Sequence, residues 1–197
     1  MIVQVKPDKI FIKACDNIMK NVPQMQERAT RDALKKGKTA FMDTKGGAPS
    51  VYNVKKSKDL APNTKVTKDS IVVESRLFTI GTTTHFSITP RNYKSQAGIP
   101  VKRRQRASAT IKRGSKRALP QSFIANPAKI NGGNVMLWER ISTKKGDKSI
   151  RPVKSISAAQ MASNEKVYPY IEENMTETYQ KRLQHYYERE VARNAVH

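Results

Sequence analysis

A turn that leads directly into a strand is indicated by the residues Asn131-Gly132-Gly133-Asn134-Val135-Met136-Leu137-Trp138-Glu139-Arg140-Ile141. The Asn-Gly-Gly-Asn tetrapeptide is typical of a hairpin turn. The seven residues after it are mostly apolar, β-branched or aromatic, and such side chains favour an extended backbone. The sequence therefore predicts a tight turn followed by a strand over residues 135–141.

Further strands are expected on both sides of this one. The candidates share β-branched residues, alternation with a period of two, or flanking turn residues, and they span residues 71–78, 84–89, 122–125 and 150–153. The last of these contains Pro152. Proline cannot donate a hydrogen bond to a ladder, so this strand is expected at the edge of a sheet. A weaker alternation over residues 2–5 also suggests a short strand.

Two helical segments are predicted near the N-terminus. Apolar residues recur at helical spacing over residues 10–19, and Met25, Ala29, Ala33, Gly37 and Phe41 step by four along one face of a second segment. Pro23 lies between them, and proline inside a helix removes a hydrogen bond and clashes with the preceding turn. We therefore expect a break or kink at residues 21–23.

A long C-terminal helix is predicted over residues 164–195. Its apolar stripe recurs every four residues, at Ile171, Met175, Tyr179, Leu183, Tyr187 and Val191. Helices and strands occupy separate parts of the chain, so the fold class is α+β: N-terminal helices, a small antiparallel sheet and a C-terminal helix. At 197 residues the chain suits one domain, spanning residues 1–197.

The charge is large and unevenly placed. Lys and Arg number 38 against 16 Asp and Glu, which gives a formal net charge of +22. No acidic residue occurs between Glu74 and Glu139, whereas basic residues are frequent there. Such a block of like charge repels itself unless a polyanion or an acidic surface is close. The alternative is a solvated surface with no specific partner.

A long basic loop is expected over residues 91–117, because this segment has few large apolar residues. Loops of this length in a small domain are functional or disordered. Its cations are candidate contacts for the phosphates of DNA or for a partner protein: Lys102, Arg103, Arg104, Arg106, Lys112, Arg113, Lys116 and Arg117. No recognition helix or zinc finger is evident, so we expect binding to be independent of base sequence.

Several classes of function are disfavoured by the sequence. The three histidines, His85, His185 and His197, lack metal-ligand spacing and lie in no nucleophile motif. The single cysteine, Cys15, can form neither an internal disulfide nor a cysteine-based zinc site. No segment has the length and apolarity of a membrane span, and no signal peptide is expected. We therefore expect no enzyme, no metal, no cofactor and no membrane association.

An ordered series of short motifs resembles the minor tail protein Z (tail completion protein) family of lambda-like long-tailed phages. It comprises Ala97-Gly98-Ile99-Pro100-Val101, Ile111-Lys112-Arg113-Gly114, Leu119-Pro120-Gln121-Ser122-Phe123-Ile124, the turn and strand from Gly132 to Arg140, Ile150-Arg151-Pro152-Val153, and Ser155-Ile156-Ser157-Ala158-Ala159-Gln160-Met161.

This resemblance implies a structural virion protein without catalytic residues. It implies a location at the head-proximal end of the tail, assembly in the host cytoplasm and a role in joining tails to filled heads. The implied partners are other copies of the chain in a ring, expected to be hexameric, the tail terminator, and tail tube or head-neck proteins. Phage DNA in the lumen would lie nearby, and the basic loop would contact that DNA or a neighbouring subunit. The alternative function is a sequence-independent nucleic-acid-binding protein.

Overall fold

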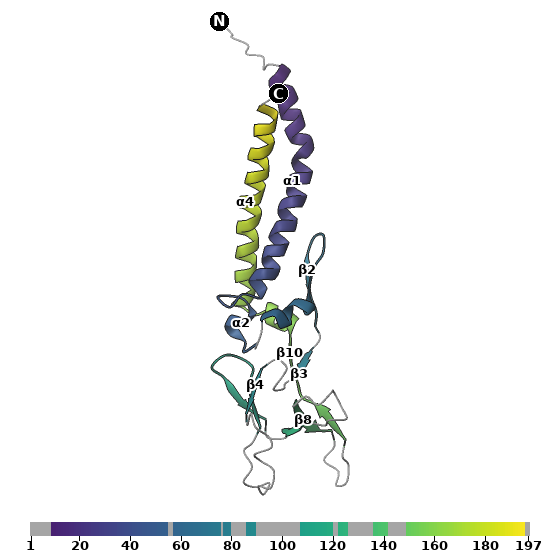
Figure 1. Cartoon of the computed structure of the whole chain (residues 1–197), viewed down its shortest axis with the longest axis vertical. Coiled ribbons are helices and arrows are strands. Elements are labelled where there is room, and N and C mark those ends of the chain that lie inside the picture. The colour runs from purple at the N-terminus through teal and green to yellow at the C-terminus, as the bar shows by residue number, and fades with distance from the viewer. Residues whose placement is uncertain are drawn as a thin grey trace.

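Two long helices form an upright antiparallel pair, and the strands gather at one end of it (Figure 1). The helices are α1 (Lys9–Phe41) and α4 (Val167–Ala195). We call this pair the stalk and the residues between the two helices the body. This computed structural model describes residues 9–54, 57–75, 77–79, 86–89, 107–119, 122–125, 136–141 and 149–195. The expected α+β class, with helices at both ends and antiparallel strands between them, is confirmed.

The face of α1 that the sequence singled out packs against α4 and the body. Met25, Ala29, Ala33 and Phe41 are all buried, as their spacing of four predicted. Gly37 lies on the same face, and a Cβ atom there would sit 2.5 Å from the Sδ atom of Met175. Small side chains on this face therefore let the two helix backbones approach closely.

Pro23 does not end α1. The expected break at residues 21–23 is wrong, because one helix runs from Lys9 to Phe41 with Pro23 inside it. Proline at this position leaves the carbonyl of Met19 without its usual helical donor. Pro23 is exposed and the side chain of Met19 is 71% exposed, so water can reach this turn of the helix.

The apolar stripe of α4 faces α1 only in its first half. Tyr187 and Val191, the last two residues of the predicted stripe, are 51% and 38% exposed. A step of four residues turns 400° around a helix, so a stripe with that spacing drifts by about 40° at each step. Tyr186 and Glu190 face α1 instead: the hydroxyl of Tyr186 hydrogen-bonds to Asp32, and Glu190 accepts a hydrogen bond from Asn21.

The described strands form four small antiparallel sheets, where a single small sheet was expected. One contains β1 (Thr64–Val66) and β2 (Ile71–Val73), and a second contains β3 (Leu77–Thr79) and β10 (Lys154–Ser157). A third has the order β4 (Ser87–Thr89), β5 (Ser108–Thr110), β6 (Lys116–Ala118). The fourth has the order β7 (Ser122–Ala125), β8 (Met136–Arg140), β9 (Ile150–Pro152).

Most of the predicted strands are present in shortened form. The predicted strand over residues 135–141 is β8, the centre of its sheet, and β9 with Pro152 is at the sheet edge as expected. Across β8 and β9, Arg151 donates from Nε to Glu139 at 2.6 Å. The single strand expected over residues 71–78 is instead two strands, β2 and β3, which pair with different partners. The expected strand at residues 2–5 and the turn at 131–134 lie outside the described residues.

Short helices connect the strands to the stalk. They are α2 (Ala48–Val51), the 3-10 helix η1 (Ser57–Asn63) and α3 (Ala158–Ala162). The side chain of Ser157 accepts a hydrogen bond from the backbone of Gln160, and the side chain of Gln160 accepts one from the backbone of Ser157. This capping box fixes the point at which the chain passes from β10 into α3.

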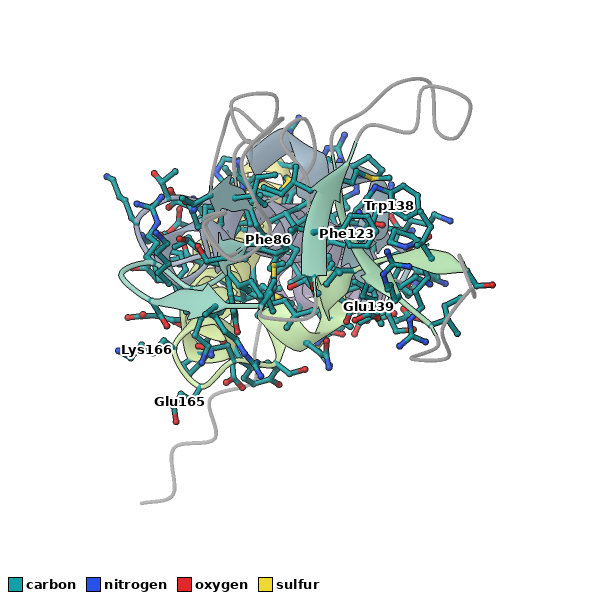
Figure 2. All side chains as sticks on the ribbon, turned by 90° about the horizontal axis from the view of Figure 1, so that it is seen from below. Phe86, Phe123, Trp138, Glu139, Glu165 and Lys166 are labelled. Atoms are coloured by element: carbon teal, nitrogen blue, oxygen red, sulfur yellow. The ribbon has the colours of Figure 1, made fainter. Side chains whose placement is uncertain are left out.

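One apolar core joins the body to the base of the stalk. Its fully buried side chains come from the end of α1, the body and the start of α4, and include Phe41, Leu60, Phe86, Leu137, Met161 and Val167. Phe86 has a positive φ of 72°, which is rare for an aromatic residue, and its side chain is completely buried. Figure 2 shows Phe86 and Phe123 near the middle of the body when it is seen along the stalk.

Replacement of Gly47 by alanine should destabilise the turn that follows α1. The added Cβ atom would lie closer than van der Waals contact to the backbone carbonyl oxygens of Ala40, Phe41 and Asp43. Because backbone atoms cannot move aside cheaply, we expect the free energy of unfolding to fall by about 1–3 kcal/mol. Thermal or urea unfolding measures this, with Thr44→Ala, at an exposed position in the same turn, as the control. An unchanged midpoint for Gly47→Ala would contradict this packing.

Candidate anion-binding site

The β5–β6 hairpin carries the described cations of the predicted basic loop. Lys112 and Arg113 lie in its turn, and Lys116 and Arg117 lie on β6, an edge strand; all four are exposed. Gly114 has a φ of +74° in the turn, a conformation that glycine adopts without strain. The hairpin therefore displays four positive charges within a few residues of one another.

A loop was expected over residues 91–117, and its described C-terminal part is instead this hairpin. Ala109 pairs with Arg117, and the strands continue on both sides of that pair. Ala107 and Ala109 are buried, so alanines fill the space beneath the hairpin that larger apolar residues usually occupy. The strand was missed because its core-facing residues are too small to give a clear apolar pattern.

Hydrogen bonds tie the turn of this hairpin to α2. The backbone N–H of Asn53 donates to the carbonyl of Ile111 at 2.8 Å, and that of Arg113 donates to the carbonyl of Val51 at 2.9 Å. The Nε atom of Arg113 also donates to the carbonyl of Pro49 at 2.7 Å. This last bond fixes the plane of the guanidinium group, whose two terminal nitrogens can then bind an anion together.

An open hollow of about 510 Å³ lies beside this turn, and cations from three parts of the chain line it. Lys45 comes from the turn after α1, Lys112 and Arg113 from the hairpin, and Lys166 from the residue before α4. Glu165 is the acid that shares the lining. Figure 2 shows Glu165 and Lys166 next to each other at the rim of the body. With four cations and one acid, the lining carries a net positive charge, which favours anions.

The first turn of α4 adds to the positive character of the hollow. Asn164 organises this helix start: its carbonyl accepts hydrogen bonds from the N–H groups of Val167 and Tyr168, and its side-chain oxygen accepts from the N–H of Lys166. Its amide group donates to the hydroxyl of Tyr52 at 3.2 Å. The N-terminus of a long helix carries a partial positive charge, which favours anions.

A hydrogen bond between the turn after α1 and the first turn of α4 holds together the elements that frame the hollow. The hydroxyl of Tyr170 donates to Oδ2 of Asp43 at 2.6 Å. This bond, helped by the backbone N–H of Lys45, keeps the pKa of Asp43 below its usual value. The same bond raises the pKa of Tyr170, and burial raises the pKa of Tyr52.

The structure brings part of the predicted site together and adds residues that the sequence did not indicate. Of the eight predicted cations, Lys112 and Arg113 line the hollow, and Lys116 and Arg117 lie on β6 of the same hairpin, outside the lining. The other four lie outside the described residues: Lys102, Arg103, Arg104 and Arg106. Lys45 and Lys166 were missed because each is isolated in the sequence and only the fold places them beside the hairpin.

The described residues contain no group of three His, Cys, Asp or Glu side chains that could hold a metal ion. Among the helices that the structure describes, none is long and apolar enough to cross a membrane. The chain matches no protein-family model, no curated protein and no solved structure.

Replacement of Tyr170 by phenylalanine should lower the free energy of unfolding by about 1 kcal/mol at neutral pH, since it removes a partly exposed hydrogen bond to a carboxylate. Asp43 has a lowered pKa, so its contribution is present above the ordinary Asp pKa of about 3.9 and is lost as the pH falls through the lower folded value. Tyr170 has a raised pKa, so its contribution is present below about 10 and is lost as the pH rises through the folded value.

The difference in stability between wild type and Tyr170→Phe should therefore be greatest between about pH 4 and 10. Urea unfolding across this range measures it. Tyr168→Phe is the matched control, because Tyr168 is exposed on the same turn of α4. If Tyr170→Phe and Tyr168→Phe have equal stabilities at pH 7, the hydrogen bond to Asp43 does not contribute.

Proposed function

We propose that this chain is a structural protein of a long-tailed phage virion, which completes the head-proximal end of the tail and helps the tail join a filled head. The ordered motifs from Ala97 to Met161 support the family to which this role belongs. In this proposal the protein acts by contact alone: the body meets DNA or a protein neighbour, and the stalk provides a long surface for assembly.

One observation carries the proposal for the body. Four cations from three separate chain segments converge on one hollow, and the hairpin that supplies two of them carries two more exposed cations on its edge strand β6. Such an arrangement suits the phosphate backbone of a nucleic acid, because that backbone carries repeated negative charges whatever the base sequence. Exposed lysine and arginine side chains on a hairpin can follow DNA that moves past them without reading its sequence.

The same surface supports a second candidate, a nucleic-acid-binding protein that acts without tail partners. Exposed cations of this kind give affinity for any duplex or single strand, with strong dependence on salt. The two candidates differ in their need for the virion, so an assembly experiment separates them while a binding experiment tests the surface that they share.

The triple variant Lys112→Ser, Lys116→Ser and Arg117→Ser should bind duplex DNA more weakly than wild type. Each lost phosphate contact lowers the slope of log affinity against log salt by about 0.9, so the slope should fall by two to three units. Arg113 is kept because it holds the turn to α2. Fluorescence anisotropy with two unrelated DNA sequences over a salt series measures the effect.

The matched control removes the same charge elsewhere, with Lys13→Ser, Lys68→Ser and Lys154→Ser, all at exposed positions away from the hollow. This control should retain a salt slope close to that of the wild type. Equal slopes for the two triple variants would mean that net charge, and not this surface, determines binding.

Deletion of the gene from a phage that carries it should yield filled heads beside separate tails. Electron microscopy of the lysate measures the fraction of joined particles. Wild-type protein supplied in trans should restore joining, and the triple hairpin variant should restore it less well. Normal joined particles in the deletion mutant would reject the tail role and leave nucleic-acid binding as the function.

A further inference from the structure

The outer side of β6 is exposed, and no strand in the part of the chain that the structure describes pairs with it. β6 ends the order β4-β5-β6, and all three of its residues are exposed. Figure 1 shows the β5–β6 hairpin in teal beside β4, at the side of the body. The outer side of an edge strand presents backbone groups onto which another extended chain can pair. We call this side of β6 the open edge.

The direction of each backbone group on β6 follows from the pairing with β5. Leu119, just after β6, donates from its backbone N–H to the carbonyl of Ala107 at 2.8 Å, so Leu119 faces the β5 side. Backbone groups of successive strand residues point to alternate sides, so Arg117 also faces β5. Lys116 and Ala118 therefore direct their N–H and C=O groups away from β5, toward the open edge.

The backbone groups at the open edge are free to bond to another molecule. Among the residues that the structure describes, none bonds to the outward N–H and C=O groups of Lys116 and Ala118. The open edge therefore offers two donors and two acceptors. They stand in the order that a second strand requires, because each outward residue presents one donor and one acceptor.

The hairpin that carries the open edge is wholly basic. Its charged residues between Ala107 and Leu119 are Lys112, Arg113, Lys116 and Arg117, with no acid among them. Successive side chains of a strand point to opposite faces, so Lys116 and Arg117 place one cation on each face of β6. A strand that pairs with β6 would therefore have a cation near it on both faces, and opposite charges across a strand pair are favourable.

A nucleic acid would satisfy only half of the open edge. The phosphate oxygens of its backbone accept hydrogen bonds, so they suit the two N–H groups, but they leave the carbonyls of Lys116 and Ala118 without donors. An extended polypeptide provides a donor and an acceptor for each outward residue. The backbone groups therefore favour a protein strand, and the cations around them favour an acidic one.

A second copy of this chain is a poor occupant of the open edge. Two such hairpins placed edge to edge would bring four cations against four, and like charges across a strand pair are destabilising. The only two acids that are adjacent in the sequence, Glu172 and Glu173, lie in the helix α4 and not in an extended segment. The occupant is therefore a different protein.

We propose that the open edge of β6 binds an extended acidic segment of another protein, which adds a fourth strand to the β4-β5-β6 sheet. Main-chain hydrogen bonds to Lys116 and Ala118 hold the added strand in register, and the cations of the hairpin select its acidic side chains. This inference goes beyond the proposed function, because strand addition requires neither DNA nor a virion.

A synthetic acidic strand tests the open edge directly. The acidic probe is a fluorescein-labelled peptide of alternating threonine and glutamate, about eight residues long. The basic probe has lysine in place of glutamate. Fluorescence anisotropy should show saturable binding of the acidic probe to the wild-type chain, and binding of the basic probe should be at least about tenfold weaker. Equal binding of the two probes, or no binding of either, would overturn the proposal.

The variant Ala118→Pro separates backbone pairing from attraction by charge. Proline removes the outward N–H and places a ring at the open edge, while every cation stays. Proline fits an edge strand when its nitrogen faces solvent, so the pairing with β5 should be kept. We expect the variant to bind the acidic probe at least about fivefold more weakly, from the lost hydrogen bond. Binding equal to that of the wild type would show that charge alone attracts the peptide.

A proline elsewhere is the matched control. Lys68 is exposed in the turn between β1 and β2, at a position of the turn where proline is favoured. The variant Lys68→Pro should bind the acidic probe within about twofold of wild type. If both proline variants weaken binding equally, the loss does not come from the open edge and the proposal is wrong.

Hydrogen exchange of single amides gives a second measurement, on the unmodified chain. The N–H groups of Lys116 and Ala118 face away from β5, whereas that of Arg117 faces it. Bound acidic probe should slow exchange at Lys116 and Ala118 at least about tenfold and leave Arg117 little changed. Nuclear magnetic resonance measures these rates. A probe that binds without protecting these two amides would be held by side chains only, contrary to the proposal.

Duplex DNA distinguishes this inference from the proposed function. Ala118→Pro keeps all the cations of the hairpin, so its salt slope for DNA binding should equal that of the wild type. A wild-type chain that binds DNA as expected but not the acidic probe would reject strand addition and leave the proposed function standing. An Ala118→Pro chain that loses DNA and probe binding to the same degree would make the open edge a nucleic-acid surface, which also overturns the inference.

Discussion

Contact between the base of α1 and the base of α4 holds the remaining elements in their places. Gly37 and Met175 bring the helices close, and the hydrogen bond from Tyr170 to Asp43 joins the end of one helix to the start of the other. All the strands lie between these two helices in the sequence, so the stalk closes a very long loop. The cations of the hollow converge because this closure brings the turn after α1, the β5–β6 hairpin and the residues before α4 to one place.

Local patterns in the sequence predicted which helices and strands form better than they predicted where each one begins and ends. The spacing of Met25, Ala29 and Ala33 identified a buried face, and the apolar residues of β8 identified the central strand of its sheet. Pro23 was a misleading signal because the turn that it disrupts faces solvent. Beyond Leu183 the predicted stripe of α4 no longer faces α1, because a repeat of four residues winds around the helix. A sequence pattern alone does not say where this contact is lost.

The site was predictable only where its residues are neighbours in the sequence. Lys112 and Arg113 stood out because they belong to a long acid-free segment. Lys45 and Lys166 have ordinary surroundings in the sequence, and they join the hollow only through contacts between distant segments. The guanidinium of Arg113 is oriented by the carbonyl of Pro49, a backbone group that no residue pattern reveals.

The stalk is not uniform along its length, and this has a consequence for its motion. Among the α1 side chains that the structure describes, from Lys13 on, the buried apolar residues begin at Met25, whereas nearer the tip Asn17 and Asn21 make side-chain hydrogen bonds to Asn194 and Glu190. Polar contacts at a partly wet interface resist separation less than buried apolar area does. Amide hydrogens near the tip should therefore exchange with solvent faster than those near the base, through partial openings that leave the body folded. The stalk would behave as a pair of helices hinged at its base, with a tip that can adjust to whatever it meets.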